Sequence, residues 1–533
     1  MVRNLKQSKA KGKKQRDANW SLGLISTLVS ILAGLIMWGA QSPWGFEPLF
    51  LIGLTLLVGV FYSASLKRAT LMGFVAGVSY FAPLIYWSSV SIGSLIPWFV
   101  LVAIQSAWWA LLGFLTASSA RLPRSVRPLL FAGLWTGIEL IRGLWPLSGF
   151  PWGTTAQASV GGVFGGLLPY GGEVLLSFSV ALVAAYCLSG LAVLPRLHLS
   201  PLPTAAAFAV LLLIGVSSFL FAPHQRFPLG NDQQLTLGLV QGGVPLPPEE
   251  SYAEPGKISG NHIRTLESGR AAQGEVQVFL AGETALDRDP RKHFEIAQPL
   301  SALNLKVPFI YGVNQYFVAP DSKLWRHNQV TGWQGEYPLK LSYDKQIPVP
   351  FGEYIPFKKF LNYFVETDKL LPTEVVPGAG PAVLTIPLAK DPVTAGIGIC
   401  FEVAFEQHMM RGIREGGTFI YVPTNNSSFG KTYEAYQQFQ LLRVRARESD
   451  RWAVGVSTNG ISGVVTPQGA VSQVTKLNES AYLKATIGLR KTLTPAVKYA
   501  PEIQVFGLIL GSIAAIVALG LDVFGYKKRP RRP

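Results

Sequence analysis

Charged residues are distributed very unevenly along this chain, and that distribution restricts the folds open to it. Residues 20–222 contain very few charged side chains and consist mostly of long apolar runs, whereas residues 223–500 have the composition of a water-soluble protein. A helix of roughly 20 apolar residues is long enough to cross the hydrocarbon core of a bilayer. The sequence therefore predicts a multi-spanning α-helical membrane domain followed by a large soluble domain.

Eight apolar segments are candidates for membrane-spanning helices, seven before the soluble domain and one after it. They are residues 20–40, 47–63, 71–88, 96–118, 128–145, 171–193, 203–222 and 503–525. The first segment is long and no small-residue cleavage site follows it, which argues against a cleaved signal peptide. The predicted domains are a basic tail at 1–19, a seven-span domain at 20–222, a soluble domain at 223–500, an eighth span at 501–526 and a basic tail at 527–533.

Lysine and arginine concentrate in the two tails and in alternate short loops of the apolar region. The loops concerned contain Lys67 and Arg68, then Arg121, Arg124 and Arg127, then Arg196. Because cytoplasmic loops are enriched in lysine and arginine, both termini are predicted to be cytoplasmic and residues 223–500 extracytoplasmic. The net charge of +16 is then a signal of membrane topology rather than of nucleic-acid binding.

Glu139 and Arg142 are three residues apart at the outer end of the fifth apolar segment, so they share one face of a helix. The following residues 149–152 combine turn residues with aromatic side chains that suit a membrane interface. We expect a structural ion pair here. Contact with a lipid headgroup is the alternative.

Strand-like and helix-like stretches alternate in the soluble part, which predicts an α/β layered domain. The predicted strands are 235–241, 276–281, 309–313, 382–386, 395–401, 418–423 and 453–457. The predicted helices are 256–270, 291–303, 402–414 and 433–448. No phosphate-binding glycine motif and no His/Cys cluster with metal-ligand spacing occurs in the sequence, so no metal is expected.

Three residues of the soluble part could perform chemistry together. Glu283 ends an apolar strand, Lys345 precedes a Pro-rich turn, and Cys400 lies at the end of a predicted strand just before a helix. Each alone has an ordinary explanation: a cap, a surface lysine or a small core residue. Together they supply a base, a cation for an oxyanion and a nucleophile. Nearby helix amides would lower the pKa of such a cysteine.

These three residues, in this order and with these flanks, resemble the catalytic triad of the nitrilase superfamily, whose fold is an αββα sandwich. Three further segments resemble that superfamily, namely residues 350–353, 445–448 and 457–463. A nitrilase-like domain placed before the last of eight spans resembles the apolipoprotein N-acyltransferase family. Trp135, Glu139, Arg142 and residues 149–152 are similar to the membrane segment of that family.

The sequence departs from the usual pattern of the family at several places. It has Ala281-Gly282 where the family often reads Trp-Pro before the glutamate. It has Asn425-Asn426 where the family often reads Asn-Asp, and Phe401 where many members have tyrosine. The stretch 242–250 lacks a tryptophan that many members place nearby. These changes resemble the actinobacterial branch, and they affect the substrate pocket rather than the triad.

The resemblance implies a two-step acyl transfer without a metal or a dissociable cofactor. Glu283 would take the thiol proton of Cys400, and Lys345 would stabilise the oxyanion. The acyl donor would be a membrane phospholipid, and the acceptor the α-amine of a diacylglyceryl-cysteine at a lipoprotein N-terminus. The resemblance also places the protein, as a monomer, in the bacterial cytoplasmic membrane. Supporting and substrate-binding roles are expected for Glu353, Glu402, Trp152, Phe360, Phe364 and Phe401.

Residues 355–371 contain many apolar side chains, together with Lys358, Lys359 and Lys369. This segment directly follows residues 350–353, so we expect it to be a membrane-contacting lid near the active site. The alternative is a core helix of the α/β domain.

Two other functions fit the same residues. A membrane-tethered amidase that hydrolyses a soluble nitrile or amide could use the same triad, although such a substrate needs no membrane spans. A scaffold that anchors a polyprenol-phosphate mannosyltransferase is the second, although a complete triad argues against a purely structural role.

Overall fold

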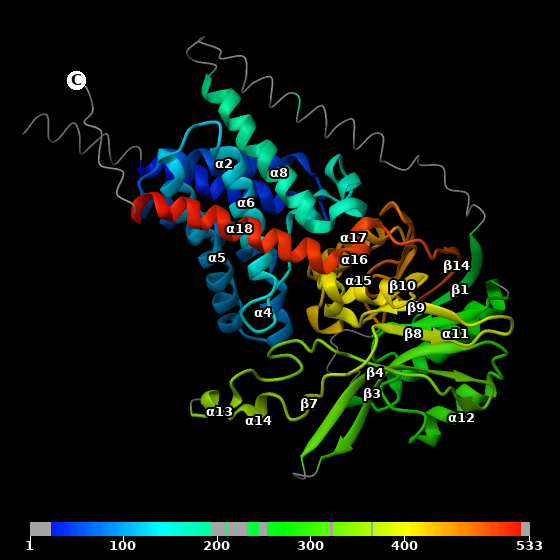
Figure 1. The fold of residues 1–533 in the computed structure, drawn as a ribbon. Helices are drawn as coiled ribbons and strands as arrows, with labels where there is room; N and C mark the ends of the chain where they lie inside the picture. Colours follow the sequence, from blue (N-terminus) through cyan, green and yellow to red (C-terminus); the bar gives the residue numbers. More distant parts are fainter. Residues whose placement is uncertain are drawn as a thin grey trace, which may run out of the picture.

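The computed structural model describes residues 23–193, 209, 232–244, 253–273, 275–319, 323–363 and 366–523. A bundle of helices lies against a domain built on two β-sheets (Figure 1). The predicted basic tails, most of the seventh apolar segment and Phe364 lie outside the described residues.

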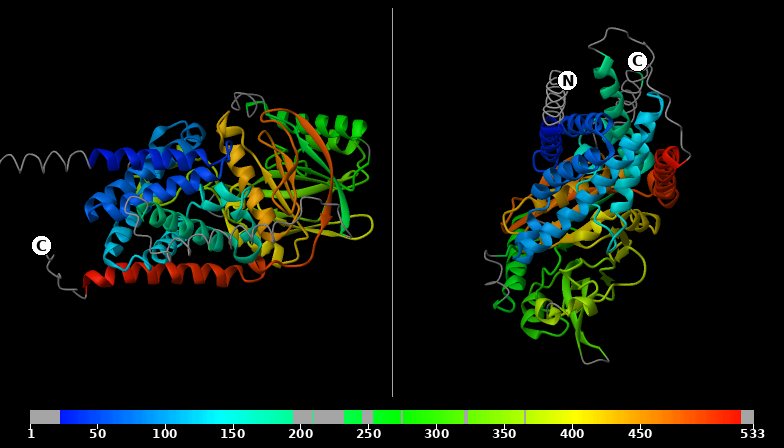
Figure 2. Two further views of the ribbon diagram at one scale, coloured as in Figure 1. Left: turned by 90° about the horizontal axis from the view of Figure 1, so that it is seen from above. Right: turned by 90° about the vertical axis from the view of Figure 1, so that its left-hand side faces the viewer.

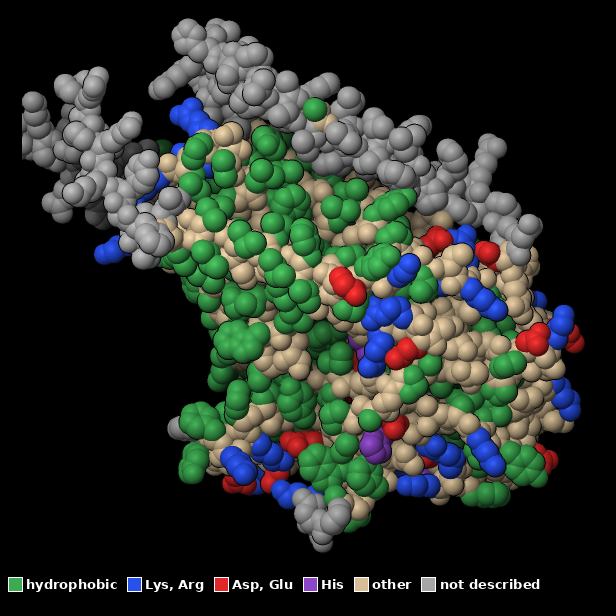
Figure 3. Space-filling view, viewed as in Figure 1, with side chains coloured by type: hydrophobic (Ala, Val, Ile, Leu, Met, Phe, Trp, Pro, Cys, Tyr) green, Lys and Arg blue, Asp and Glu red, His purple; other side chains and the backbone are tan. Residues whose placement is uncertain are grey.

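The helices of the bundle follow the apolar segments of the sequence. They are Gly23–Gly39, α2 (Pro48–Ser63), α3 (Leu66–Leu84), α4 (Trp87–Ile92), α5 (Leu95–Ser118), α6 (Arg127–Arg142), α7 (Thr155–Ser159), α8 (Leu168–Val193) and α18 (Ala500–Val523). Among the described residues, three helices are long and apolar enough to cross a membrane: Leu95–Arg121, Phe164–Leu188 and Ala500–Gly520. The outer face of the bundle in Figure 3 is mostly hydrophobic, whereas charges are scattered over the sheet domain. The eight-span count stays a prediction.

The helices depart from the predicted apolar segments at two places. α3 begins at Leu66 rather than at residue 71, and its first turn includes Lys67 and Arg68. Long basic side chains at a helix end can keep their charge in water while the helix starts, so they do not mark its boundary. α8 is not straight, because Gly171 and Gly172 leave the helical conformation.

Arg142 is buried and organises the turn after α6. Its guanidinium donates hydrogen bonds to the carbonyl oxygens of Phe150, Trp152 and Gly153, at 2.9 to 3.1 Å. Glu139 lies 3.9 Å from Arg142 and accepts hydrogen bonds from the backbone N–H and the hydroxyl of Thr155. These contacts agree with the expected structural role of the Glu139–Arg142 pair.

The strands form two sheets in the described part of the chain. The first contains β1 (Gln233–Gln241), β2 (Val278–Ala281), β3 (Phe309–Val318), β4 (Leu324–Gln334), β5 (Tyr337–Pro338) and β14 (Ala481–Leu489), in the order β14-β1-β2-β3-β4-β5, with β6 (Tyr343–Asp344) and β7 (Glu374–Val375) beside β4. The second contains β8 (Val383–Ile386), β9 (Val393–Ile397), β10 (Phe419–Thr424), β11 (Ala453–Ser457), β12 (Gly463–Val465) and β13 (Val471–Val474), in the order β13-β12-β11-β10-β9-β8.

The two sheets pack face to face, with one helical layer outside each. Leu237 and Leu280 of the first sheet share a hydrophobic core with Ile397 and Val454 of the second. α11 (Lys257–Gln273) and α12 (Phe294–Ala302) cover the first sheet, and α15 (Glu406–Arg414) and α16 (Glu434–Ser449) cover the second. The predicted αββα sandwich is therefore confirmed.

The layer of α15 and α16 is also the face that meets the helical bundle. One hydrophobic core joins Met410 and Leu441 of this layer to residues of α2, α5, α6 and α8. Figure 2 shows α18 leaving the sheet domain and running back along the outside of the bundle. The two domains thus share their core rather than being joined only by a linker.

Arg445 of α16 is fully buried at this joint. It pairs with Glu448 of the same helix at 2.6 Å and with Glu173 of α8, and it donates hydrogen bonds to the carbonyl oxygens of Val403 and Ala404. One guanidinium therefore connects the bundle, α16 and the turn that follows Cys400.

Replacing this guanidinium should be strongly destabilising. Arg445→Met leaves Glu173 and Glu448 without their cation in a buried place, so the free energy of unfolding should fall by about 3–5 kcal/mol. Denaturant unfolding in detergent micelles measures the change, with Arg264→Met on the exposed face of α11 as the matched control. Equal stability of the two variants would show that Arg445 does not hold the joint.

Candidate active site

Glu283 is placed by contacts with both sheets. It follows the end of β2; its backbone N–H donates to the carbonyl of Thr424 at 3.1 Å, and its own carbonyl accepts a hydrogen bond from the hydroxyl of Thr458. Gly282 packs directly against the backbone of Thr458, where a side chain would clash. The glycine that departs from the family pattern therefore fits this close approach.

Lys345 lies between two carboxylates. Its Nζ is 3.3 Å from Glu283 and 2.9 Å from Glu353, and the side-chain amide of Asn328 donates to both carboxylates at 2.6 and 2.9 Å. Burial alone would lower the pKa of Lys345, but Glu283 and Glu353 outweigh burial and raise it. The ammonium is therefore held in its charged form.

Cys400 lies in a sharp turn, not in a strand as the sequence analysis expected. β9 ends at Ile397, and residues Cys400–Ala404 form the 3-10 turn η4. Cys400 has a positive φ of 54°, a backbone conformation that side-chain-bearing residues rarely adopt and that is common at functional sites. Gln438 of α16 donates a hydrogen bond to its sulfur, with 3.3 Å between Nε2 and Sγ.

The expected lowering of the cysteine pKa is wrong. Burial, followed by the negative charge of Glu283, raises the pKa of the Cys400 thiol well above its ordinary value, although Lys345 acts in the opposite direction. Amides at the start of a short turn do not compensate for complete removal from water. A raised pKa favours the neutral thiol form of Cys400.

Glu402 connects the turn of Cys400 to the loop after Lys345. One carboxylate oxygen accepts the backbone N–H groups of Gln346 and Ile347, at 2.6 and 2.9 Å. The other accepts the Tyr343 hydroxyl at 2.8 Å and the Ile399 N–H at 2.7 Å. Glu402 thus supports the site without any described contact with the cysteine sulfur.

Two of the four predicted substrate-binding residues, Trp152 and Phe401, lie together. Phe401 stacks on Trp152, with 6.4 Å between ring centroids, and on Phe150 at 6.3 Å. The indole N–H groups of Trp152 and Trp87 both donate to the side-chain oxygen of Gln437 on α16. Aromatic residues from the bundle therefore pack against Phe401, the residue that follows Cys400.

Phe360 lies apart from this aromatic group, on an arm that projects away from the two sheets (Figure 1). The arm contains the short helices α13 (Lys358–Leu361) and α14 (Thr367–Leu370), and no residue of α13 is buried. The alternative of a core helix is therefore wrong for the described residues.

Sequence reasoning missed several residues of the site. Asn328 lies on β4, which was not predicted as a strand. Gln438 and Glu434 lie on a predicted helix but carry no motif that would distinguish them. Burial raises the pKa of Glu434 to about 8. The hydrogen bond from Asn426 acts against this rise, and the charge of Glu283 adds to it.

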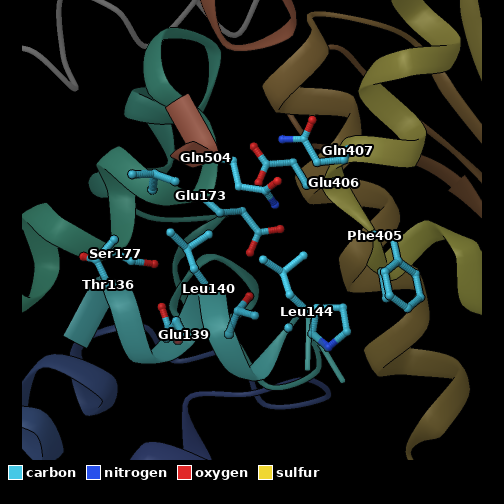
Figure 4. Close-up of a pocket in the computed structure, with 15 residues that line it drawn as sticks. Thr136, Glu139, Leu140, Leu144, Glu173, Ser177, Phe405, Glu406, Gln407 and Gln504 are labelled. Atoms are coloured by element: carbon cyan, nitrogen blue, oxygen red, sulfur yellow. The ribbon is translucent and has the colours of Figure 1, made fainter. Parts of the chain in front are cut away.

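A separate pocket lies at the joint between the domains, where α6, α8 and α18 meet α15. Figure 4 shows the carboxylates of Glu173 and Glu406 gathered with the amides of Gln407 and Gln504, while Leu140, Leu144 and Phe405 line the rest. Burial, with repulsion from Glu448, raises the pKa of Glu406 well above its usual range. The pocket lining does not include Glu283, Lys345 or Cys400.

Family comparisons agree with this two-part architecture. Residues 33–186 match the apolipoprotein N-acyltransferase N-terminal domain, and residues 304–492 match the carbon-nitrogen hydrolase family. The protein is thus a carbon-nitrogen hydrolase-type enzyme built onto a helical bundle.

Relatives over the whole length identify the family. An apolipoprotein N-acyltransferase of Mycolicibacterium smegmatis is 30% identical, over 95% of this chain and 88% of the relative. One from Azotobacter vinelandii is 26% identical, over 90% and 92%. The chain belongs to the apolipoprotein N-acyltransferase family, and it is an acyltransferase.

A solved structure of Nit3 from Saccharomyces cerevisiae, a member of branch 10 of the nitrilase superfamily, is also similar to part of this chain. It covers 56% of this chain and 97% of its own, with 16% identity and a TM-score of 0.34.

Glu402 offers a test of how the site is held together. Glu402→Gln replaces one acceptor oxygen with an amide N–H donor that faces other donors, so the free energy of unfolding should fall by about 1–3 kcal/mol. Denaturant unfolding in detergent measures the change, and Glu267→Gln on exposed α11 is the control. A Glu402 variant as stable as the control would contradict the bridging role.

Proposed function

We propose that Cys400 carries the acyl chain, that Glu283 is its general base and that Lys345 stabilises the oxyanion. The main support is the placement of the buried Lys345 ammonium, 3.3 Å from Glu283 and 2.9 Å from Glu353. Burial raises the pKa of the Cys400 thiol, and the charge of Lys345 acts against this rise. Lys345 is thus held as a cation beside the nucleophile. Glu353 positions Lys345, and Glu402 positions both the lysine loop and the cysteine turn.

In the first half-reaction, Glu283 takes the thiol proton and the sulfur attacks an ester carbonyl of a membrane phospholipid. Lys345 and a backbone N–H stabilise the negative charge on the carbonyl oxygen. The carbon–oxygen bond to the glycerol then breaks, and the leaving oxygen receives the proton from Glu283. A lyso-phospholipid departs, and a thioester remains on Cys400.

In the second half-reaction, the α-amine of a diacylglyceryl-cysteine at a lipoprotein N-terminus attacks the thioester. Glu283 takes the proton that the amine loses, and the same oxyanion groups act again. The carbon–sulfur bond breaks, the amide forms, and the proton returns to the sulfur. No step requires a metal or a dissociable cofactor.

The proposed setting is the bacterial cytoplasmic membrane. Residues 20–222 and 501–526 would contain eight spans, both basic tails at 1–19 and 527–533 would be cytoplasmic, and the catalytic domain at 223–500 would be extracytoplasmic. The substrates are both membrane-bound, which gives the spans a purpose. We propose that the protein acts as a monomer; a polyprenol-phosphate mannosyltransferase is a candidate partner.

The aromatic group beside Cys400 is suited to an acyl chain. Trp152 and Phe401 are buried and stacked, and Phe401 directly follows Cys400 in the chain, so we propose that they form an apolar wall for the acyl chain. Apolar contact at this place would keep water away from the thioester until the amine arrives.

The arm at residues 355–371 is proposed as a membrane-contacting lid. Its side chains Phe357, Phe360, Tyr363 and Leu370 are 72%, 62%, 84% and 67% exposed. An exposed apolar group of this kind marks a protein or membrane contact. The lysines are weaker support, because Lys358 pairs with Asp368 and Glu374, and Lys369 pairs with Glu366.

Cys400→Ala should abolish acyl transfer while the protein stays folded. Wild-type enzyme incubated with phospholipid should gain the mass of one acyl chain, and peptide mapping by mass spectrometry should place it on Cys400. Cys187→Ala should retain the adduct and the activity, because Cys187 lies in α8 away from the triad. An adduct on another residue, or activity in Cys400→Ala, would disprove the assignment.

The same measurement separates the roles of the other two triad members. Glu283→Gln and Lys345→Met should each slow adduct formation by about 10²–10³, the usual effect of losing one oxyanion donor or a base. Near-normal labelling of Cys400 in Glu283→Gln would remove Glu283 as the base.

Phe360→Asp tests the lid. The aspartate should raise the phospholipid concentration needed for half-maximal labelling, because a charge opposes insertion of the arm among lipids. Thermal unfolding should stay close to that of the wild type, since Phe360 is largely exposed. Lys340→Asp on another exposed loop is the control. Unchanged use of phospholipid by Phe360→Asp would refute the lid.

A further inference from the structure

The sulfur of Cys400 receives a hydrogen bond that the triad does not supply. The side-chain N–H of Gln438 points at it, with 3.3 Å between Nε2 and Sγ, and Gln438 is buried. The ionisable groups that act on the thiol are Glu283, Lys345 and Glu434. We propose that Gln438 is a further catalytic residue, whose N–H stabilises the thiolate formed when Glu283 removes the thiol proton.

The direction of this hydrogen bond is fixed by its neighbours. A backbone N–H can only donate, and that of Gly460 donates to the Ser457 hydroxyl oxygen at 2.6 Å. The hydroxyl then donates to the side-chain oxygen of Asn426 at 2.7 Å. The Asn426 amide donates in turn to the side-chain oxygen of Gln438 at 2.8 Å, which leaves the N–H end of Gln438 for the sulfur of Cys400.

Asn426 is therefore a positioning residue, and it stands where the family often has aspartate. The same Nδ2 group also donates to a carboxylate oxygen of Glu434 at 2.7 Å. An aspartate at this position has no N–H to give to either acceptor. The departure from the family pattern thus sets the orientation of Gln438 in this chain.

A donor at this place matters because the site is dry. Burial disfavours the thiolate, and the carboxylate that must remove the proton adds its own negative charge nearby. A hydrogen bond to a charged group in a water-poor site is stronger than one in water. Gln438 opposes both effects without adding a charge, and it leaves Lys345 to the carbonyl oxygen of the substrate.

Alkylation of Cys400 by iodoacetamide tests the assignment without any substrate. The assignment rests on Cys400 as the acyl carrier, but this readout reports only the thiol. In the full-length protein in detergent, Gln438→Met should slow alkylation of the Cys400 peptide at neutral pH about tenfold and raise its half-maximal pH by about one unit. Gln440 lies on the same helix as Gln438 and donates a hydrogen bond to the carbonyl oxygen of Gln157 in α7. Gln440→Met loses this bond but should keep the wild-type profile.

Asn426→Asp provides a second, independent test. It does not replace a group that touches Cys400, yet it should turn the Gln438 amide and shift the alkylation profile in the same direction. In steady-state assays with phospholipid, kcat should fall while KM stays unchanged. If Gln438→Met does not fold, Asn426→Asp decides the question. Wild-type alkylation profiles in the folded variants would overturn the proposal, whereas an acyl adduct away from Cys400 would overturn the triad instead.

Discussion

The buried guanidinium of Arg445 is the contact on which the arrangement of the whole enzyme depends. It neutralises Glu173 of the bundle and Glu448 of α16, and it binds the carbonyl oxygens of Val403 and Ala404 in the turn after Cys400. A buried charge tolerates little displacement of its partners, because an unpaired ion in a dry site costs several kcal/mol, of the order of 3–5. The cysteine turn and the bundle are therefore fixed relative to each other.

The helix that carries Arg445 also carries residues that contact the bundle and Cys400. Gln437 accepts hydrogen bonds from Trp87 and Trp152 of the bundle, and the next residue, Gln438, donates to the sulfur of Cys400. Neighbouring helical positions point in different directions, so adjacent glutamines can serve both domains. α16 therefore contacts both the candidate active site and the helical bundle.

Much of the fold and the site could be predicted from the sequence because both depend on local patterns. Apolar runs located the long described helices of the bundle but not the short helices α4 and α7, and the strands before Glu283 and Cys400 were recognised by their apolar residues. β4 was missed because Leu324–Gln334 contains scattered polar residues, and it carries Asn328, which joins Glu283 to Glu353. The contacts of Gln438 also had no local signal, since they depend on Asn426 and Ser457 from other elements.

The raised pKa of the Cys400 thiol gives the buried site a chemical consequence. In the proposed mechanism, a thiol that is neutral at rest reacts slowly with water-borne electrophiles, and it becomes a nucleophile only when Glu283 accepts its proton. When the thiolate attacks an ester carbonyl bound beside Lys345, the negative charge moves to the carbonyl oxygen, where Lys345 would stabilise it. Under this mechanism, burial makes reactivity conditional on a substrate that comes from the bilayer, and α16, which contacts both Cys400 and the helical bundle, would link the two.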